Sequence, residues 1–270
     1  MEVTPSGLVS FLALVGACAS PPETLRIDGS AGVAPLVSAL VTEYRARQPS
    51  PPVVMASGMG SSARLNAVEE GRIDIAMASH GLDEADLEKR ALTTRPIAKT
   101  AVVFAVHSSV PITALTSQQV CDIYAGRITN WRQVGGADLA IAALTRPPGE
   151  VDADVALDGT PCLRSVTNAS GVQVIERPDE MARAIAATVG GIGLTSAPMV
   201  EQSAGRMKAL TLDGRAPTVN NVASAAYPLA RSAILVYRKK TSPAVEQFLA
   251  FINSEQGQRI IAANGAVPSR

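Results

Sequence analysis

The sequence predicts an α/β fold in which an open parallel sheet is divided between two lobes. Short apolar runs of strand length alternate along the chain with segments whose apolar residues recur at helical spacing. This alternation is typical of a parallel sheet covered by helices. The length of 270 residues is enough for two lobes of ordinary domain size, and a composition with 47% hydrophobic and 18% charged residues excludes a disordered chain.

The first part of the chain predicts three strands separated by two helices. Residues 25–30 read LRIDGS, a short apolar strand that ends in small residues, and residues 33–48 carry apolar side chains at helical spacing. The same order then repeats, with a strand and a Gly/Ser loop at 52–62, a helix at 62–71 and a strand at 72–79. Two strand-loop-helix units in succession are therefore expected.

A long strand is expected at the centre of the sheet. Residues 97–108 read IAKTAVVFAVHS and are almost continuously apolar, which is typical of a strand that is covered on both faces. The elements expected after it are a helix at 117–126, a strand at 139–145, a helix at 177–190 that ends at Gly190 and Gly191, strands at 191–196 and 230–239, and a helical C-terminus in two pieces at 242–265.

The first residues indicate an export signal. Residues 7–17 form the apolar run GLVSFLALVGA, which has the length of a signal-peptide core and is too short to span a membrane as a helix. The small residues that precede Cys18 resemble the bacterial lipobox, so we expect residues 1–22 to be a signal peptide, lipobox and tether, with Cys18 as the lipidation site. An ordinary secretory signal and a buried first strand are the alternatives. Glu2, with no Lys or Arg before the apolar run, departs from the usual pattern.

The remaining cysteines and the two histidines do not predict a metal site. Cys121 and Cys162 have no metal-like spacing, and His80 and His107 are isolated from each other. Export would permit a disulfide. Because Cys121 lies on the face of a predicted helix, we favour a small buried thiol, and the pairing of Cys121 with Cys162 stays open. No cofactor is expected.

The charge balance and the aromatic content exclude several partners. Twenty-four basic residues against twenty-four acidic residues give zero net charge, so no bulk field attracts nucleic acid or an anionic membrane. Aromatic residues make up only 3% of the chain, with a single Trp, which disfavours base-stacking platforms. A charged partner must therefore be recognised locally.

Three loops after predicted strands have the chemistry of an anion site. In open α/β sheets, ligands bind at the carboxyl ends of the strands, where loop amides and helix N-termini point outward. Each Ser/Gly loop could equally be an ordinary helix cap. A third loop carries Arg146, which could hold a ligand with two hydrogen bonds or could be a surface charge. The loop residues concerned are Ser30, Ala31 and Gly32 in the first loop and Gly60, Ser61 and Ser62 in the second.

Several motifs resemble those of the phosphate-binding proteins that feed ABC transporters. Residues 114–136, ALTSQQVCDIYAGRITNWRQVGG, closely resemble the family signature LT..Q..DIF.GKITNW..VGG. The resemblance extends to four further stretches: the first loop at 28–36, the second loop and following strand at 57–79, residues 212–231, and the C-terminal SEQGQRIIAANGAVP. It therefore covers nearly all of residues 25–268. It implies the type II periplasmic-binding-protein fold, a clamp of two α/β lobes with the ligand between them. The expected lobes are residues 23–105 with 224–270, and residues 106–223.

The resemblance also implies which residues hold the ligand. The first phosphate loop of the family matches Ser30 and Ala31, its second-loop serine falls at Ser61, and its third-loop arginine falls at Arg146. The expected ligand-binding set is Ser30, Ala31, Gly32, Gly60, Ser61, Ser62, Ser79, His80, Arg146 and Gly149.

The third loop departs from the family pattern. Phosphate binders carry Gly-Ser-Gly-Thr there, whereas this chain keeps Gly149 and continues with Glu150, Val151 and Asp152, followed by Asp154. Each carboxylate within about 4 Å of a phosphate dianion would oppose it by roughly 4 kcal/mol per unit-charge pair. Either these acids turn into solvent or the ligand is not phosphate. His80 stands where many relatives have Asp or Arg.

These observations predict a solute-binding protein. We expect it to capture phosphate or a similar small oxyanion, to deliver it to the membrane permease of an ABC transporter, and to act as a monomer in the periplasm or at the cell surface, anchored by lipid. The alternatives are a clamp for another small solute and a sensor or scaffold lipoprotein with no transported ligand. An enzyme is disfavoured, because Ser79 and His80 are adjacent in a strand and point to opposite faces.

Overall fold

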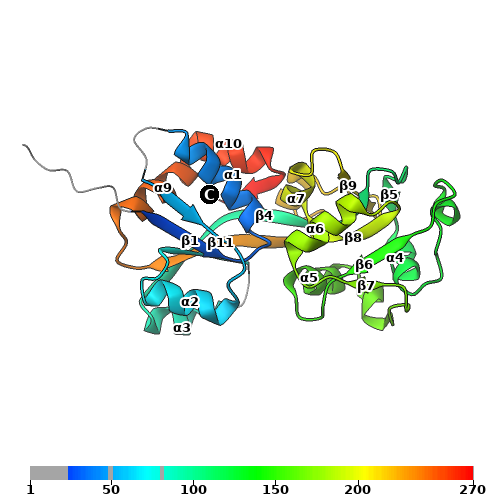
Figure 1. The fold of residues 1–270 in the computed structure, drawn as a ribbon, viewed down its shortest axis with the longest axis horizontal. Coiled ribbons are helices and arrows are strands. Elements are labelled where there is room, and N and C mark those ends of the chain that lie inside the picture. The colour runs from blue at the N-terminus through cyan, green and yellow to red at the C-terminus, as the bar shows by residue number, and fades with distance from the viewer. Residues whose placement is uncertain (1–23, 48–50, 80–81, 270) are drawn as a thin grey trace, which may run out of the picture.

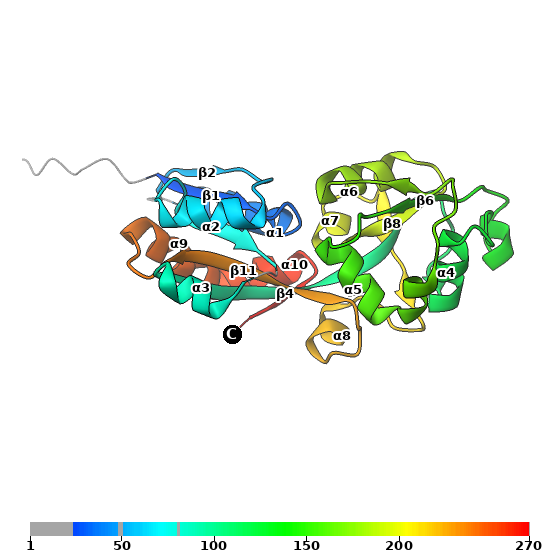
Figure 2. The same cartoon turned by 90° about the horizontal axis from the view of Figure 1, so that it is seen from below.

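The computed structural model describes residues 24–47, 51–79 and 82–269. The chain forms two lobes that are joined by two neighbouring strands, β4 (Leu92–His107) and β11 (Ala230–Arg238) (Figure 1). Strand β4 is long enough to belong to the sheets of both lobes, since its first half pairs with β11 and its second half with β8 (Gly191–Ser196). The view from below shows the same two bodies with β4 between them (Figure 2).

Lobe I is the body built on the order β2-β1-β3-β11-β4. Its strands β1, β2 and β3 pair in parallel, and helices cover both faces of the sheet. The elements are β1 (Leu25–Gly29), α1 (Ala34–Arg45), β2 (Val53–Met55), α2 (Ser61–Glu69), β3 (Ile75–Ala78), α3 (Glu84–Lys89), α9 (Pro243–Asn253), α10 (Glu255–Ala263) and β12 (Ala266–Pro268).

Lobe II is the body built on the order β4-β8-β6-β7. Strand β9 pairs with the end of β4, and a separate two-stranded sheet joins β5 to β10. The elements are β5 (Ala114–Leu115), α4 (Ser117–Tyr124), η1 (Trp131–Val134), β6 (Ala142–Thr145), α5 (Val151–Gly159), η2 (Pro161–Ser165), β7 (Gln173–Val174), α6 (Pro178–Ala187), α7 (Ala197–Glu201), β9 (Met207–Ala209), β10 (Thr211–Leu212) and α8 (Val219–Ala223).

The expectation of a parallel sheet is only partly correct. The strands before β4 are parallel, as are β6, β7 and β8, but β11 is antiparallel to both β3 and β4, and β4 is antiparallel to β8. The cause is the path of the chain, which leaves lobe I on β4 and returns on β11. Two neighbouring strands that lead out and back must run in opposite directions.

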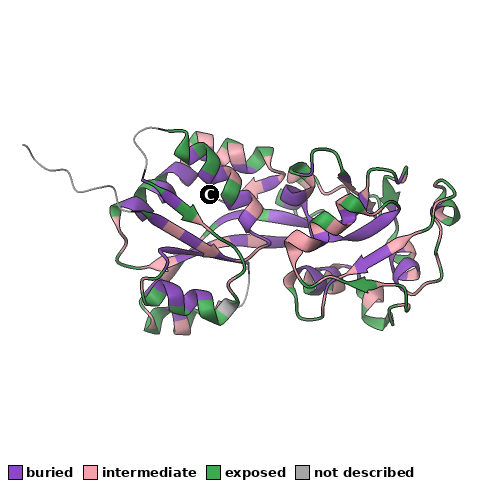
Figure 3. Cartoon of the chain, in the orientation of Figure 1, coloured by how far each residue is buried: buried purple, intermediate pink, exposed green. Residues whose placement is uncertain are grey.

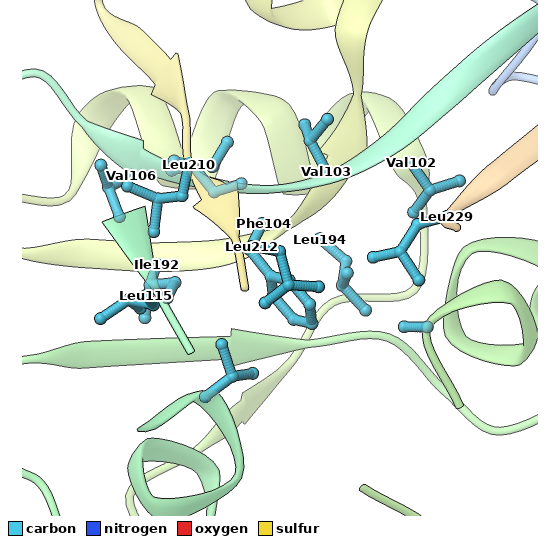
Figure 4. Packing of buried hydrophobic residues seen from close by; sticks show 14 of the residues in the cluster. Val102, Val103, Phe104, Val106, Leu115, Ile192, Leu194, Leu210, Leu212 and Leu229 are labelled. Atoms are coloured by element: carbon cyan, nitrogen blue, oxygen red, sulfur yellow. The ribbon is translucent and has the colours of Figure 1, made fainter. Parts of the chain in front are cut away.

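Each lobe has its own apolar core, and β4 contributes to more than one. In lobe II, Val102, Val103, Phe104 and Val106 pack against side chains that include Ile192 (Figure 4). In lobe I, one cluster lies under α1, α9 and α10 and another under α2 and α3. The buried stretches follow the central strands through both lobes (Figure 3). The lobe boundaries predicted at residues 105/106 and 223/224 stay predictions.

Most expected elements occur, with shifted ends. Strand β4 begins at Leu92, five residues before the expected start, because residues 93–96 alternate between half-buried and exposed positions and lack a continuous apolar run. Helix α5 was not expected from its sequence, VDADVALDG, in which acids interrupt the apolar spacing. The short α3, α7 and α8 also carry too few apolar residues to show a period.

The interpretation of Cys121 as a free buried thiol is wrong. Cys121 on α4 is bonded to Cys162 on η2, with Cα atoms 6.2 Å apart. Its burial was expected, but the partner could not be inferred, because η2 is brought beside α4 only by the tertiary fold.

The export segment predicted at residues 1–22 lies outside the described residues, as does Cys18. Within residues 24–47, 51–79 and 82–269, no helix combines the length and the apolar character that crossing a bilayer requires.

Candidate functional site

A cavity of about 350 Å³ lies where loops of lobe I meet loops of lobe II. Lobe I contributes the end of β1, the loop before α2 and one residue of α2. Lobe II contributes the segments that lead into α5 and α6, two helices on the side of lobe II that faces lobe I (Figure 1). The lining residues are Gly29, Ser30, Ala31, Gly58, Met59, Gly60, Arg64, Gly149, Glu150, Val151, Glu176, Arg177 and Pro178. We refer to this cavity as the interlobe cleft.

Close backbone packing fixes the two loops of lobe I. The amide of Ser30 donates to the carbonyl of Met77 (2.9 Å), and the amide of Gly58 donates to the carbonyl of Gly29 (2.9 Å). Gly29 has φ +132°, and a Cβ atom there would lie 2.4 Å from the carbonyl oxygen of Met77, so only glycine fits. The two glycine-containing loops therefore form one continuous wall of the cleft, with Ala31 beside it.

Two arginines reach the cleft from opposite lobes. Arg64 lies on α2 and is 4% exposed, and burial lowers the pKa of its guanidinium. Because the ordinary arginine pKa is far above neutrality, Arg64 remains a buried cation. Arg177 precedes α6 and lies against the second loop of lobe I, since a Cβ at Gly58 would be 3.2 Å from its Nη1. An arginine thus lines the cleft on each side, together with the carboxylates Glu150 and Glu176 of lobe II.

Carboxylates on α6 hold Arg177 in place. Its Nε lies 3.1 Å from Oδ1 of Asp179 and 3.8 Å from Oε1 of Glu180. Burial opposes the ionisation of Asp179, but the charges of Arg177 and Arg183 and a hydrogen bond from Arg183 outweigh it and lower the pKa of Asp179. Asp179 is therefore ionised at neutral pH, and it pairs with Arg177 where that residue lines the cleft.

Arg146 does not line the interlobe cleft. Its side chain is 1% exposed and points into lobe II, where Nη1 donates to the carbonyl of Ile175 (2.5 Å). Its Nη2 lies 3.0 Å from Oε2 of Glu150, which does line the cleft. A carboxylate of this chain thus occupies the side of Arg146 that was expected to face the ligand.

The three acids of the altered loop have three different environments. Glu150 lies at the cleft wall with its side chain 47% exposed, and Asp154 is exposed on α5. Asp152 is buried, with Oδ1 2.5 Å from Nη1 of Arg231, and both side chains are at most 4% exposed. Nη2 of Arg231 also donates to the carbonyl of Gly32 (2.9 Å). This buried pair connects α5 of lobe II to the first loop of lobe I through β11.

The structure brings together four of the predicted ligand-binding residues. Ser30, Ala31, Gly60 and Gly149 line the cleft. Four others do not line it: Gly32 lies against Arg231, Ser62 is exposed, Ser79 is buried, and Arg146 lies behind Glu150. The side chain of Ser61 and all of His80 lie outside the described residues.

Sequence reasoning missed Arg64, Arg177 and Glu176. Arg64 is the fourth residue of α2, one turn after the second loop. Because helical side chains point back toward the helix N-terminus, a residue at this position can reach the loop. Arg177 and Glu176 immediately precede α6, whose start is marked by Pro178. The start of α2 and the start of α6 could both have been found by treating the first turn of every helix that follows a strand as part of the site. Among the described residues, no group of three metal-ligating side chains occurs.

Two α/β lobes with a polar cavity between them define a bilobal ligand-binding protein. A family model described as the PBP superfamily domain matches residues 16–256, and the chain belongs to this family. Among curated proteins it is similar to the phosphate-binding protein PstS of Bacillus subtilis, with 26% identity over 251 residues, which are 91% of this chain and 80% of that protein.

Solved structures give the same relationship. One is a Clostridium perfringens protein with bound phosphate, described as a phosphate ABC transporter substrate-binding protein (TM-score 0.73, 26% identity, 92% of this chain and 100% of that chain). Another is an ABC-type phosphate transport receptor from Vibrio cholerae (TM-score 0.60, 28% identity, 90% and 99%). These matches confirm the type II periplasmic-binding-protein fold and the family resemblance.

Proposed function

We propose that the chain is an extracytoplasmic solute-binding protein that captures phosphate or a similar small oxyanion in the interlobe cleft. The observation that carries this proposal is the pair of guanidinium groups, Arg64 from lobe I and Arg177 from lobe II, on one cavity that is also lined by the glycine-containing loops of lobe I. Cations from both lobes would favour the closed clamp when an anion lies between them.

The mechanism that we propose has three parts. Ser30 and the loop around Gly60 contact the oxyanion first, because they lie on the fixed wall of lobe I. Arg177 then reaches it from lobe II as the lobes approach each other about β4 and β11. Arg146 acts indirectly, by pairing with Glu150 and so reducing the repulsion between that carboxylate and the ligand. This is a positioning role in place of the direct contact that the family pattern implies.

Titration calorimetry with inorganic phosphate tests the proposal. Arg64→Gln and Arg177→Gln should each weaken binding by roughly 10- to 100-fold, as expected for the loss of a charge-assisted hydrogen bond worth about 1.5–3 kcal/mol. Arg164→Gln is the matched control, because Arg164 is an exposed arginine of lobe II whose partner is Asp158. Equal affinity in all four proteins would reject the site, and no heat from the unaltered protein at millimolar phosphate would reject the ligand.

The placement of the protein in the cell is part of the proposal. It rests on the apolar run at 7–17 followed by Cys18, and on the names of the relatives. We propose a signal peptide, a lipid-anchored monomer and delivery to an ABC permease. Mass spectrometry of the membrane fraction should find the chain beginning at a lipidated Cys18, and an unmodified N-terminus upstream of that residue would contradict the anchor.

One observation favours a second candidate. Glu150 and Glu176 both line the cleft, and carboxylates there oppose a dianion. A clamp for a different small solute, or a sensor without a transported ligand, would tolerate them. A thermal-shift screen separates these cases, since a ligand at 100 times its dissociation constant adds about 2.7 kcal/mol of stability. A shift with a neutral or zwitterionic solute and none with phosphate would favour the second candidate.

A further inference from the structure

A second cavity lies entirely within lobe II, behind helix α5. Its volume is about 180 Å³, far above the roughly 10–15 Å³ that a single water requires. Its walls come from α4, β6 and the loop after it, α5, η2, β8 and the segment after η2. Most of the lining is aliphatic, from Ala153, Ala156, Leu157, Leu163, Val166 and Leu194.

Polar residues also line this cavity, namely Tyr124, Thr145, Asn168 and Arg146, and Arg146 is the charged one. Arg146 lines the cavity and is 3% exposed. Its Nη1 and Nη2 are bound by the carbonyl of Ile175 and by Glu150, but its Nε is buried without an acceptor among the described residues. A buried N–H of a charged group that lacks an acceptor is costly, so the site is incomplete as it stands.

The chemistry of the cavity selects a class of ligand. The buried Nε–H requires an acceptor, and a carboxylate is the strongest acceptor that organic ligands offer to a guanidinium. Glu150 contacts Nη2 of Arg146 and leaves Nε without an acceptor among the described residues. The aliphatic walls exclude a fully hydrated ion such as phosphate and favour a short hydrocarbon chain. Asn168, which is exposed, marks the side of the cavity that opens to solvent.

We propose that this cavity is a second ligand site, for a small aliphatic carboxylate whose head group accepts a hydrogen bond from Nε of Arg146. The hydrocarbon part lies between α5 and η2, against Ala156 and Leu163. The site is separate from the interlobe cleft, because none of its aliphatic lining residues contacts that cavity. It does not depend on the function proposed for the cleft.

The test uses butyrate as the probe and butyramide as its neutral counterpart of similar shape. Calorimetry should give millimolar binding of butyrate and at least about tenfold weaker binding of butyramide, because the charge-assisted hydrogen bond is lost. In protein with ¹⁵N-labelled arginine, butyrate should also shift the Nε–H resonance of Arg146. Absence of butyrate binding at tens of millimolar would overturn the site, and equal binding of the two probes would overturn the ligand class.

Variants that fill the cavity localise the binding. Ala156→Leu should abolish butyrate binding, and Ala153→Leu does the same from the neighbouring turn of α5 in case the first variant does not fold. Ala187→Leu, at an exposed position of α6, is the matched control and should bind butyrate as the unaltered protein does. Butyrate binding that persists in a folded cavity-filling variant would place the probe elsewhere and overturn the proposal.

Discussion

Removal of the Asp152 carboxylate should strongly destabilise the protein. In Asp152→Ala, Arg231 would keep its charge in a site where its side chain is 4% exposed and where the carbonyl of Gly32 is its remaining hydrogen-bond acceptor in the described structure. Breaking a buried ion pair on one side costs about 3–5 kcal/mol. That is a large part of the total stability of about 5–15 kcal/mol that is usual for folded proteins.

The magnitude converts into a measurable shift of the melting temperature. With an unfolding entropy of about 2.1 cal/mol/K per residue, a loss of 3 kcal/mol lowers the Tm of a 270-residue chain by about 5 °C. Urea unfolding should be followed both by circular dichroism and by the fluorescence of Trp131, which reports on lobe II alone. Coincident transitions would show that the lobes unfold together.

The double variant Asp152→Leu with Arg231→Met distinguishes pairing from packing. Because it removes both charges, it should recover most of the stability that the single variant loses. The control is Asp158→Ala on the same helix, whose exposed partner is Arg164 and whose loss should cost less than about 1 kcal/mol. If Asp152→Ala costs no more than this control, or if the double variant loses the sum of the single losses, the buried pair does not hold the lobes together.

Three further outcomes are expected. Reduction of the Cys121–Cys162 disulfide, which spans 41 residues, should lower the free energy of unfolding by up to about 4 kcal/mol in the chain-entropy model. An unchanged urea midpoint in the presence of dithiothreitol would contradict this prediction. Burial raises the pKa of Tyr227. The stability that the neutral Tyr227 side chain contributes is therefore complete below the ordinary tyrosine pKa of about 10 and is lost as the pH rises toward the pKa of the folded state. Tyr227→Phe should lessen this alkaline loss of stability, which circular dichroism measures. Gly29→Ala should destabilise the protein by more than about 1 kcal/mol, because the new Cβ meets the carbonyl of Met77; full thermal stability would show that β1 can move away.

The sequence was sufficient to predict elements whose apolar pattern is strong. The strand at β1, the helix at α1 and the C-terminal pair α9 and α10 all show the period that burial on one side requires. Helix α5 was not predictable in this way, because Asp152 occupies a buried position through its ion pair with Arg231. A hydrophobic pattern cannot indicate a charged residue that is buried by a partner 79 positions away.

The candidate site was predictable in its loops but not in its cations. Ser30, Ala31 and Gly60 follow from the general position of ligands after strands of an α/β sheet. Arg146 was expected in the cleft from its place after a predicted strand and from the resemblance, but the neighbouring Glu150 pairs with it and its guanidinium lies inside lobe II. The contribution of Arg64 depends on how α2 is rotated about its axis, which the loop pattern does not determine.

The insertion of β11 between β3 and β4 restricts the order in which the two lobes can complete their sheets. In lobe I, β3 and β4 are adjacent in sequence but are separated in the sheet by a strand that is made only at residues 230–238. Lobe II needs only residues that precede β11 to complete its own sheet. The sheet of lobe I, by contrast, lacks the strand between β3 and β4 until residues 230–238 take their place. We therefore expect truncation before residue 230 to interrupt the sheet of lobe I between β3 and β4, while lobe II keeps every strand of its sheet.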